Sequence, residues 1–130
     1  MMDVNGLINA ASQLLFKEKK YAEAIEKLYQ ALDGITDKST QIAEQIRIKS
    51  WLGHCYYKQA MKVKDTDEAD KPFSDAITYG HESLELAQEL EIEQLRSQIQ
   101  ISLQFWLGLC YLEWIKRTKS TSKTVQASQP

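Results

Sequence analysis

Residues that interrupt regular structure are scarce in this sequence. Its 130 residues include only two prolines and five glycines, so most of the chain can run as uninterrupted helix. Stretches of alternating apolar and polar residues, which would indicate β-strands, are also absent. Apolar residues recur instead every three or four positions, which is the spacing of an amphipathic helix. We therefore expect an all-α protein.

Several classes of protein are disfavoured by what the composition lacks. Two cysteines, Cys55 and Cys110, are too few for a disulfide framework and lack the spacing of metal ligands, so a cytoplasmic location is expected. With 16 basic and 18 acidic side chains, the net charge of −2 supplies no basic field for nucleic acid. The most apolar stretch, residues 101–115, is shorter than the roughly 20 residues that span a bilayer. The N-terminus does not resemble a signal peptide, and we expect no membrane association.

The apolar spacing predicts five helices followed by a polar segment. Asp3 is a plausible N-cap for the first helix, Gly34 ends the second, and Pro72 suits the first turn of the fourth. The predicted helices span, in order, Asp3–Lys19, Tyr21–Asp33, Ser39 or Thr40–Met61, Pro72–Leu90 and Glu91 or Glu93–Arg117. The charged residues 62–71 are a loop or a solvated helix extension. Residues 118–130 are polar without apolar spacing, so we expect one domain over residues 1–117 and a disordered tail.

A six-residue motif occurs twice, 55 positions apart. The sequence Trp-Leu-Gly-His-Cys-Tyr at 51–56 recurs as Trp-Leu-Gly-Leu-Cys-Tyr at 106–111, with five of six residues identical. A glycine inside a helix costs about 1 kcal/mol relative to alanine, so two glycines at matched positions predict close helix packing. We expect both helices to occupy the same structural niche.

These two segments resemble the first helix of a tetratricopeptide repeat (TPR), in which Leu-Gly is followed three residues later by an aromatic residue. The segment 21–32 is similar to the second TPR helix, with Ala24 and Ala31 at its small positions. Residues 73–86 follow that pattern more loosely. The resemblance covers about residues 4–117 and implies antiparallel helix pairs in a right-handed superhelix. The chain departs from the pattern at Ala11-Ser12, where Leu-Gly is expected, in the position of its tryptophans, and in an insertion within the second repeat.

TPR proteins bind partners through a concave face lined by the first helix of each pair, which implies a protein-binding function here. We therefore expect a scaffold or adaptor that holds a helix or an extended peptide of another protein. Carried over residue by residue, the face consists of Asn9, Gln13, Phe16, Arg47, Ser50, His54, Tyr57, Lys58, Ser102 and Phe105, with Leu109 and Leu112 further along the last helix.

Motifs that carry catalysis are absent. The sequence has no Gly-rich phosphate loop, no His-Glu-x-x-His and no Gly-x-Ser-x-Gly. His54 and Cys55 are adjacent, but neighbours in a helix diverge by about 100° and do not face one another. The acidic residues 65–70 lack the central glycine of a calcium loop. We expect no enzyme activity, no cofactor and no metal.

The last helix suggests an alternative function, a structural homo-oligomer. Nine of the eleven residues from Phe105 to Ile115 are apolar, and at about 100° per residue they cover every side of the helix. Repeat arrays normally end in a polar-faced cap, which this sequence lacks. We expect this helix to pack against a second copy, with twofold symmetry, or against a partner that completes the array. The candidate interface residues are Leu109, Leu112 and Trp114.

Overall fold

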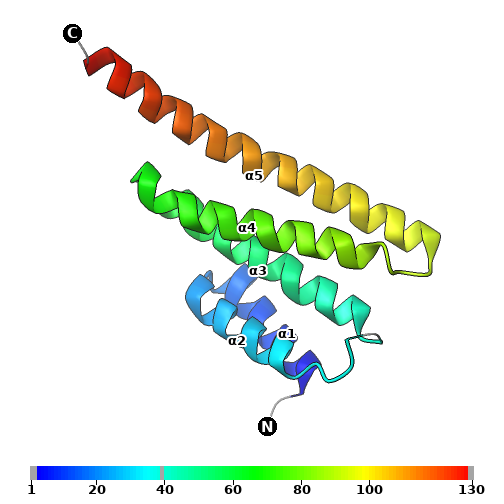
Figure 1. Ribbon diagram of the computed structural model, residues 1–130. Helices are drawn as coiled ribbons and strands as arrows, with labels where there is room; N and C mark the ends of the chain where they lie inside the picture. The colour runs from blue at the N-terminus through cyan, green and yellow to red at the C-terminus, as the bar shows by residue number, and fades with distance from the viewer. Residues whose placement is uncertain (1–2, 39, 129–130) are drawn as a thin grey trace.

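The computed structural model describes residues 3–38 and 40–128, and in this part of the chain it consists of helices without strands (Figure 1). The prediction of an all-α fold is confirmed. The helices are α1 (Val4–Ser12), its π-helical continuation η1 (Gln13–Lys17), α2 (Tyr21–Asp33), α3 (Ile42–Lys62), α4 (Thr66–Ala87) and α5 (Glu93–Ser128). Ser39, one of the two predicted starts of the third helix, lies outside the described residues, and α3 begins just after Thr40.

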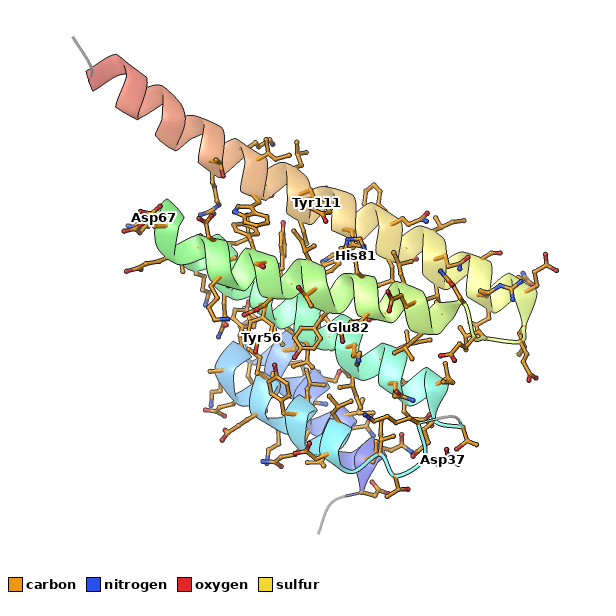
Figure 2. All side chains as sticks on the ribbon, in the orientation of Figure 1. Asp37, Tyr56, Asp67, His81, Glu82 and Tyr111 are labelled. Atoms are coloured by element: carbon orange, nitrogen blue, oxygen red, sulfur yellow. The ribbon has the colours of Figure 1, made fainter. Side chains whose placement is uncertain are left out.

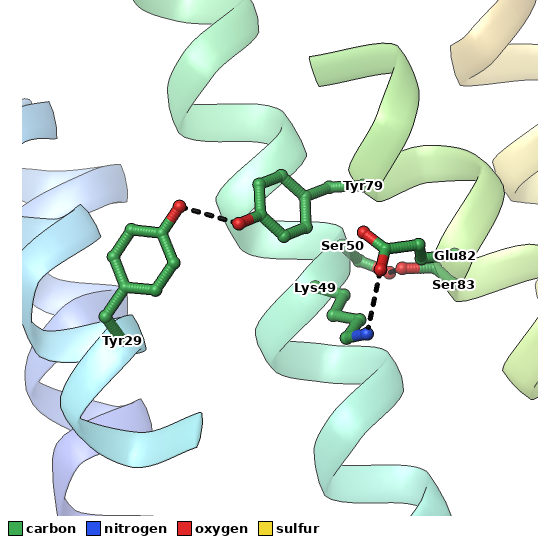
Figure 3. Close-up of polar contacts among 6 residues, drawn as sticks. All are labelled: Tyr29, Lys49, Ser50, Tyr79, Glu82 and Ser83. Carbon is green, nitrogen blue, oxygen red and sulfur yellow. Dashed lines mark hydrogen bonds and ion pairs between the residues drawn. The ribbon is translucent and has the colours of Figure 1, made fainter. Parts of the chain in front are cut away.

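The helices are arranged in two layers. On one side, η1 at the end of α1 contacts α3 through the rings of Phe16 and Trp51, which lie 5.7 Å apart, and α3 contacts α5 through His54 and Trp106. On the other side, α2 contacts α4 through the hydroxyl groups of Tyr29 and Tyr79, which are 2.6 Å apart (Figure 3). The odd-numbered helices therefore share one face of the molecule, and the even-numbered helices share the opposite face.

Carboxylate side chains set the starts of α1 and α4. Asp3 accepts a hydrogen bond from the backbone N–H of Gly6 at 2.7 Å, as the N-cap prediction requires. Asp65 accepts a hydrogen bond from the backbone N–H of Asp67 at 2.9 Å. The acidic side chains of the first turn interact favourably with the positive end of the helix dipole. This cap starts α4 at Thr66, so Pro72 lies inside the helix. The prediction that Pro72 occupies the first turn is wrong, because the acidic cap starts the helix ahead of it.

The core follows the small and apolar positions of the repeat pattern. Ala24 and Ala31 of α2 are fully buried and belong to one cluster with Ile8 of α1 and Leu52 of α3. A second cluster forms around the fully buried ring of Phe73, between α3 and α4. The helices of each predicted pair approach closely because alanine carries almost no side chain at the contact.

The two matched glycines do not occupy the same niche. A Cβ added at Gly53 would lie 2.9 Å from Cη2 of Trp106 and 3.1 Å from the carbonyl oxygen of Ala76, whereas a Cβ at Gly108 would meet nothing within 4 Å. The difference arises because α4 covers Gly53, while the described residues contain no helix that covers Gly108. Tyr111, the last residue of the second copy of the motif, is likewise 40% exposed.

α5 continues well beyond Arg117, where the sequence predicted its end. Its backbone is helical to Ser128, across the segment for which a disordered tail was predicted, and this end of α5 projects past the start of α4 (Figure 1). No glycine or proline occurs between Gly108 and Pro130, so no residue there breaks the helical geometry. Residues 129–130 lie outside the described part of the chain.

Candidate partner-binding groove

A cleft of about 530 Å³ opens on the face shared by α1, α3 and α5. Spacings of three and four residues bring side chains of each helix to this one face. The lining residues are Phe16, Ile46, Arg47, Ser50, Trp51, His54, Gln98, Ile99, Ser102, Leu103 and Trp106. Within this set, Phe16, Arg47, Ser50, His54 and Ser102 are residues that the TPR resemblance implied, so the structure brings these five together.

A chain of aromatic rings crosses the cleft from α1 to α5. Phe16 meets Trp51 edge to face at 5.7 Å and an 84° interplanar angle, and it lies 5.8 Å from His54. His54 in turn stacks on Trp106 at 6.3 Å. Such contacts are attractive because the positive edge or the offset face of one ring meets the negative face of another. Phe16 nonetheless keeps 52% of its surface exposed, which leaves an aromatic surface available to a ligand.

The charge of the cleft comes mainly from Arg47. Burial lowers the pKa of His54, and the nearby Lys58 cation lowers it further, so the imidazole is neutral at pH 7. It can therefore donate or accept a hydrogen bond through its ring nitrogens. Arg47 is exposed and carries its charge at all physiological pH values. The cleft thus combines apolar rings, polar side chains and one full positive charge.

Ser50 and Tyr57 on α3 are oriented partly or wholly away from the cleft. The hydroxyl of Ser50 donates to the hydroxyl of Ser83 at 3.2 Å, beside the ion pair of Lys49 with Glu82 (Figure 3). The Tyr57 ring packs between the helices, and burial raises the pKa of its phenol. Tyr57 is half-buried and does not line the cleft, so the structure does not place it in the predicted groove. Its ring instead packs edge to face against Phe73 of α4 and Trp106 of α5.

The remaining predicted groove residues lie outside the cleft. Asn9 is exposed on α1, Gln13 is exposed at the start of η1, and Lys58 is half-buried on α3, but none of them lines the cleft. Phe105 is 70% exposed and is also absent from the lining. It lies about 60° around α5 from Ser102, further from the cleft.

The predicted interface residues on α5 divide into two groups. Leu109 and Leu112 are 40% and 47% exposed, as the oligomer hypothesis expects. Trp114 instead points into the protein, where its ring stacks on Phe73 at 6.1 Å and its Nε1 donates to the Asp70 carboxylate at 2.6 Å. Trp114 is therefore committed to an intramolecular contact, because α4 supplies both an apolar face and an acceptor for the indole.

Sequence reasoning missed both tryptophans of the cleft, since Trp51 and Trp106 were not among the predicted groove residues. A signal was present, however. Trp51 follows Arg47 by four residues and precedes His54 by three, and Trp106 follows Ser102 by four. Residues at these steps share a helix face, so the tryptophans were placed beside the predicted groove residues by spacing alone.

The described residues offer little for covalent or metal chemistry. Burial raises the pKa of both Cys55 and Cys110 to about 12, so both remain protonated thiols near pH 7, and the thiol is a weak nucleophile compared with the thiolate. The same part of the chain contains no group of three His, Cys, Asp or Glu residues that could hold a metal ion. Nor does any of its helices have the length and apolar character needed to cross a membrane.

No protein family, no curated protein and no solved structure matches the chain. Evidence on function therefore comes from the residues and geometry of the chain itself.

Proposed function

We propose that this chain is a TPR-like scaffold or adaptor that binds a segment of another protein in the cleft between α1, α3 and α5. The observation that carries the proposal is the cleft itself, which lies on the odd-numbered helices where the TPR resemblance implies a groove. The recurrence of Trp-Leu-Gly-x-Cys-Tyr in α3 and α5 and the two antiparallel helix pairs support the same assignment. A right-handed superhelix of the TPR kind is part of this proposal.

The lining favours a partner segment with an apolar or aromatic anchor and an acidic group. The rings of Phe16, Trp51 and Trp106 offer flat apolar surface, which binds such anchors at low conformational cost. Arg47 offers five N–H donors in a planar fork that fits a carboxylate. A helix or an extended peptide is thin enough to lie in a cleft between helices.

On this proposal the protein acts by binding and does not catalyse a reaction. Its partner is a protein and not nucleic acid, because the net charge of −2 gives no attraction to phosphates. Two thiols without a disulfide suit a reducing compartment, and we propose the cytoplasm.

Site-specific photo-crosslinking tests the proposal. A photoreactive amino acid is placed at Ser102 inside the cleft and, as the matched control, at Glu85, an exposed position on α4. Irradiation of cells that make the protein should produce a discrete crosslinked partner from position 102 and none from position 85. Mass spectrometry of the crosslinked product identifies the partner and the segment that touches the cleft.

Charge reversal then tests the role of the cleft in affinity. Arg47→Glu should weaken binding of the identified partner by at least about tenfold, the loss expected for one charge-assisted contact. The control Lys64→Glu reverses an exposed charge on the loop between α3 and α4 and should leave the affinity unchanged. Full binding by a folded Arg47→Glu variant that also carries Ser102→Trp, which fills the cleft, would show that the partner binds elsewhere.

A further inference from the structure

A row of exposed apolar side chains runs along the outer side of α5 and reaches α4 only at Tyr111, whose hydroxyl meets His81. Its members are Ile101, Phe105, Tyr111, Leu112 and Ile115, between 40% and 70% exposed. Together with Gln104 and Gly108 they recur at steps of three and four residues, which places them within about 120° of one another around the helix. We call this row the α5 seam. Polar residues precede it at Gln94 and Ser97 and follow it at Thr118.

The α5 seam corresponds to a face that is already used for helix packing elsewhere in the chain. Shifting its positions by the 55-residue repeat gives Ile46, Lys49, Ser50, Gly53, Tyr56, Tyr57 and Ala60 of α3. Ile46, the equivalent of Ile101, lines the cleft, and the other six contact α4. Lys49 pairs with Glu82, Ser50 bonds to Ser83, Gly53 lies against Ala76, and Tyr56 stacks on Tyr79.

The last two members of the α3 face complete the correspondence. Tyr57 meets the ring of Phe73, and Ala60 belongs to the same buried cluster. The contacts on α4 run in reverse order along the chain, from Glu82 near one end of the face to Phe73 near the other, so α4 packs antiparallel to α3. The equivalent face of α5 is larger and more apolar, since Phe105 and Ile115 stand where α3 has Ser50 and Ala60, yet it lies bare among the described residues.

We propose that a second copy of this chain covers the α5 seam, with the two α5 helices packed antiparallel and crossing at Gly108. The seam is nearly symmetric about this glycine, with Ile101 seven residues before it and Ile115 seven after it. Phe105 stands three residues before it, and Tyr111 and Leu112 stand three and four after it. A seam that is the same in both directions is self-complementary in an antiparallel pair related by a twofold axis.

Gly108 suits the crossing point because it lets two helix backbones approach closely. A Cβ there would meet nothing within 4 Å in one copy, so the space above it is open to a neighbour. In the antiparallel pair, Ile101 of one copy lies opposite Ile115 of the other. Phe105 lies beside Leu112 of the other copy, which buries the most exposed ring of the seam.

The exposed area of the seam, if it is covered completely, reaches the lower limit for a specific dimer. A large side chain carries roughly 150–250 Å² of surface, so five of them at about half exposure leave about 500 Å² per copy. Two copies then bury about 1,000 Å² in total, the level that separates specific interfaces from incidental contacts. This area forms one stripe about 21 Å long, since 14 residues separate its ends at 1.5 Å each.

The dimer leaves the cleft accessible. Ser102 and Trp106 line the cleft from positions about 120° and 160° around α5 from Gly108. Tyr111 lies at the opposite edge of the seam, where its hydroxyl meets His81 of α4 at 3.1 Å (Figure 2). Gln98, the lining residue nearest the seam, lies about 20° around the helix from Phe105. Self-association and partner binding therefore use adjacent surfaces of α5 made of different residues, and each can be tested by substitutions of its own.

Sedimentation equilibrium of the full chain tests the dimer. The wild type should sediment as a dimer at micromolar concentration. Leu112→Glu should raise the dimer dissociation constant by at least about 100-fold, because twofold symmetry introduces the buried charge twice. The matched control Thr78→Glu adds the same charge at an exposed site of α4 and should leave the constant unchanged. Circular dichroism verifies that both variants are folded. A wild type that stays monomeric at high micromolar concentration would overturn the proposal.

Cysteine crosslinking tests the direction and register of the helices. Gly108→Cys should form a disulfide-linked dimer under mild oxidation, whereas Ile101→Cys alone should not, because its two copies lie about 21 Å apart. A mixture of Ile101→Cys and Ile115→Cys should form the mixed dimer. The wild type serves as the background control, since Cys55 and Cys110 are buried. Efficient self-crosslinking by Ile101→Cys would indicate parallel helices and refute the antiparallel arrangement.

Discussion

The two glycines of the repeated motif provide a direct test of the packing described above, since they share a sequence context and differ in surroundings. Replacing glycine by alanine inside a helix stabilises it by about 0.5–1 kcal/mol when the new methyl group has space. Gly108→Ala meets nothing within 4 Å and should raise the free energy of unfolding by about that amount. The same change at Gly53 gains the same helix propensity, so any difference between the variants reports tertiary contacts.

At Gly53 the added Cβ would lie 2.9 Å from Trp106 Cη2 and 3.1 Å from the Ala76 carbonyl oxygen. Trp106 is held on its other side by His54, and a backbone oxygen inside a helix cannot move alone. Overpacking of this kind typically costs about 1–3 kcal/mol. We expect Gly53→Ala to be destabilising by about 1–2 kcal/mol after the helix propensity is counted, which leaves a gap of about 1.5–3 kcal/mol between the two variants.

Urea unfolding followed by circular dichroism measures the gap. Both changes are made in the Leu112→Glu background, so that self-association through α5 does not contribute to the measured stability. The slope of the unfolding free energy against urea should be the same in all variants, which indicates that the compactness of the end states is unchanged. If Gly53→Ala proved as stable as Gly108→Ala, Trp106 and Ala76 would not enclose Gly53 as described.

Two further predictions follow from contacts of single side chains. Tyr29→Phe removes the hydroxyl that lies 2.9 Å from that of Tyr56 and 2.6 Å from that of Tyr79. It should lower the unfolding free energy by about 1–2 kcal/mol in the same urea assay. An unchanged unfolding free energy would show that these hydroxyls do not hold α2 against α3 and α4. His54 should make the protein less stable in mild acid: its folded pKa lies below the usual 6.5, so the unfolded chain takes up a proton first and stability falls as the pH drops below about 6.5. His54→Gln should flatten the thermal stability profile between pH 7 and 5.5, and an unchanged slope would mean that another group is responsible.

The sequence alone determined the class of fold and the faces of the helices. The periodic apolar residues, the cap at Asp3 and the scarcity of proline and glycine act within one helix, where spacing along the chain translates directly into position around the axis. For the same reason, the set containing Phe16, Arg47, His54 and Ser102 was placed on a shared face before the structure was known, and these residues line one cleft.

Only the tertiary structure decided which of two equivalent positions is buried. The motif around Gly53 and its copy around Gly108 are nearly identical in sequence, but α4 covers one and leaves the other open. Trp114 was expected at the surface and instead stacks on Phe73, while Phe105 was expected in the groove and lies on the α5 seam. Each outcome depends on which neighbouring helix is present and how it crosses, and that information comes from side chains distant in the sequence and not from the local pattern of any one helix.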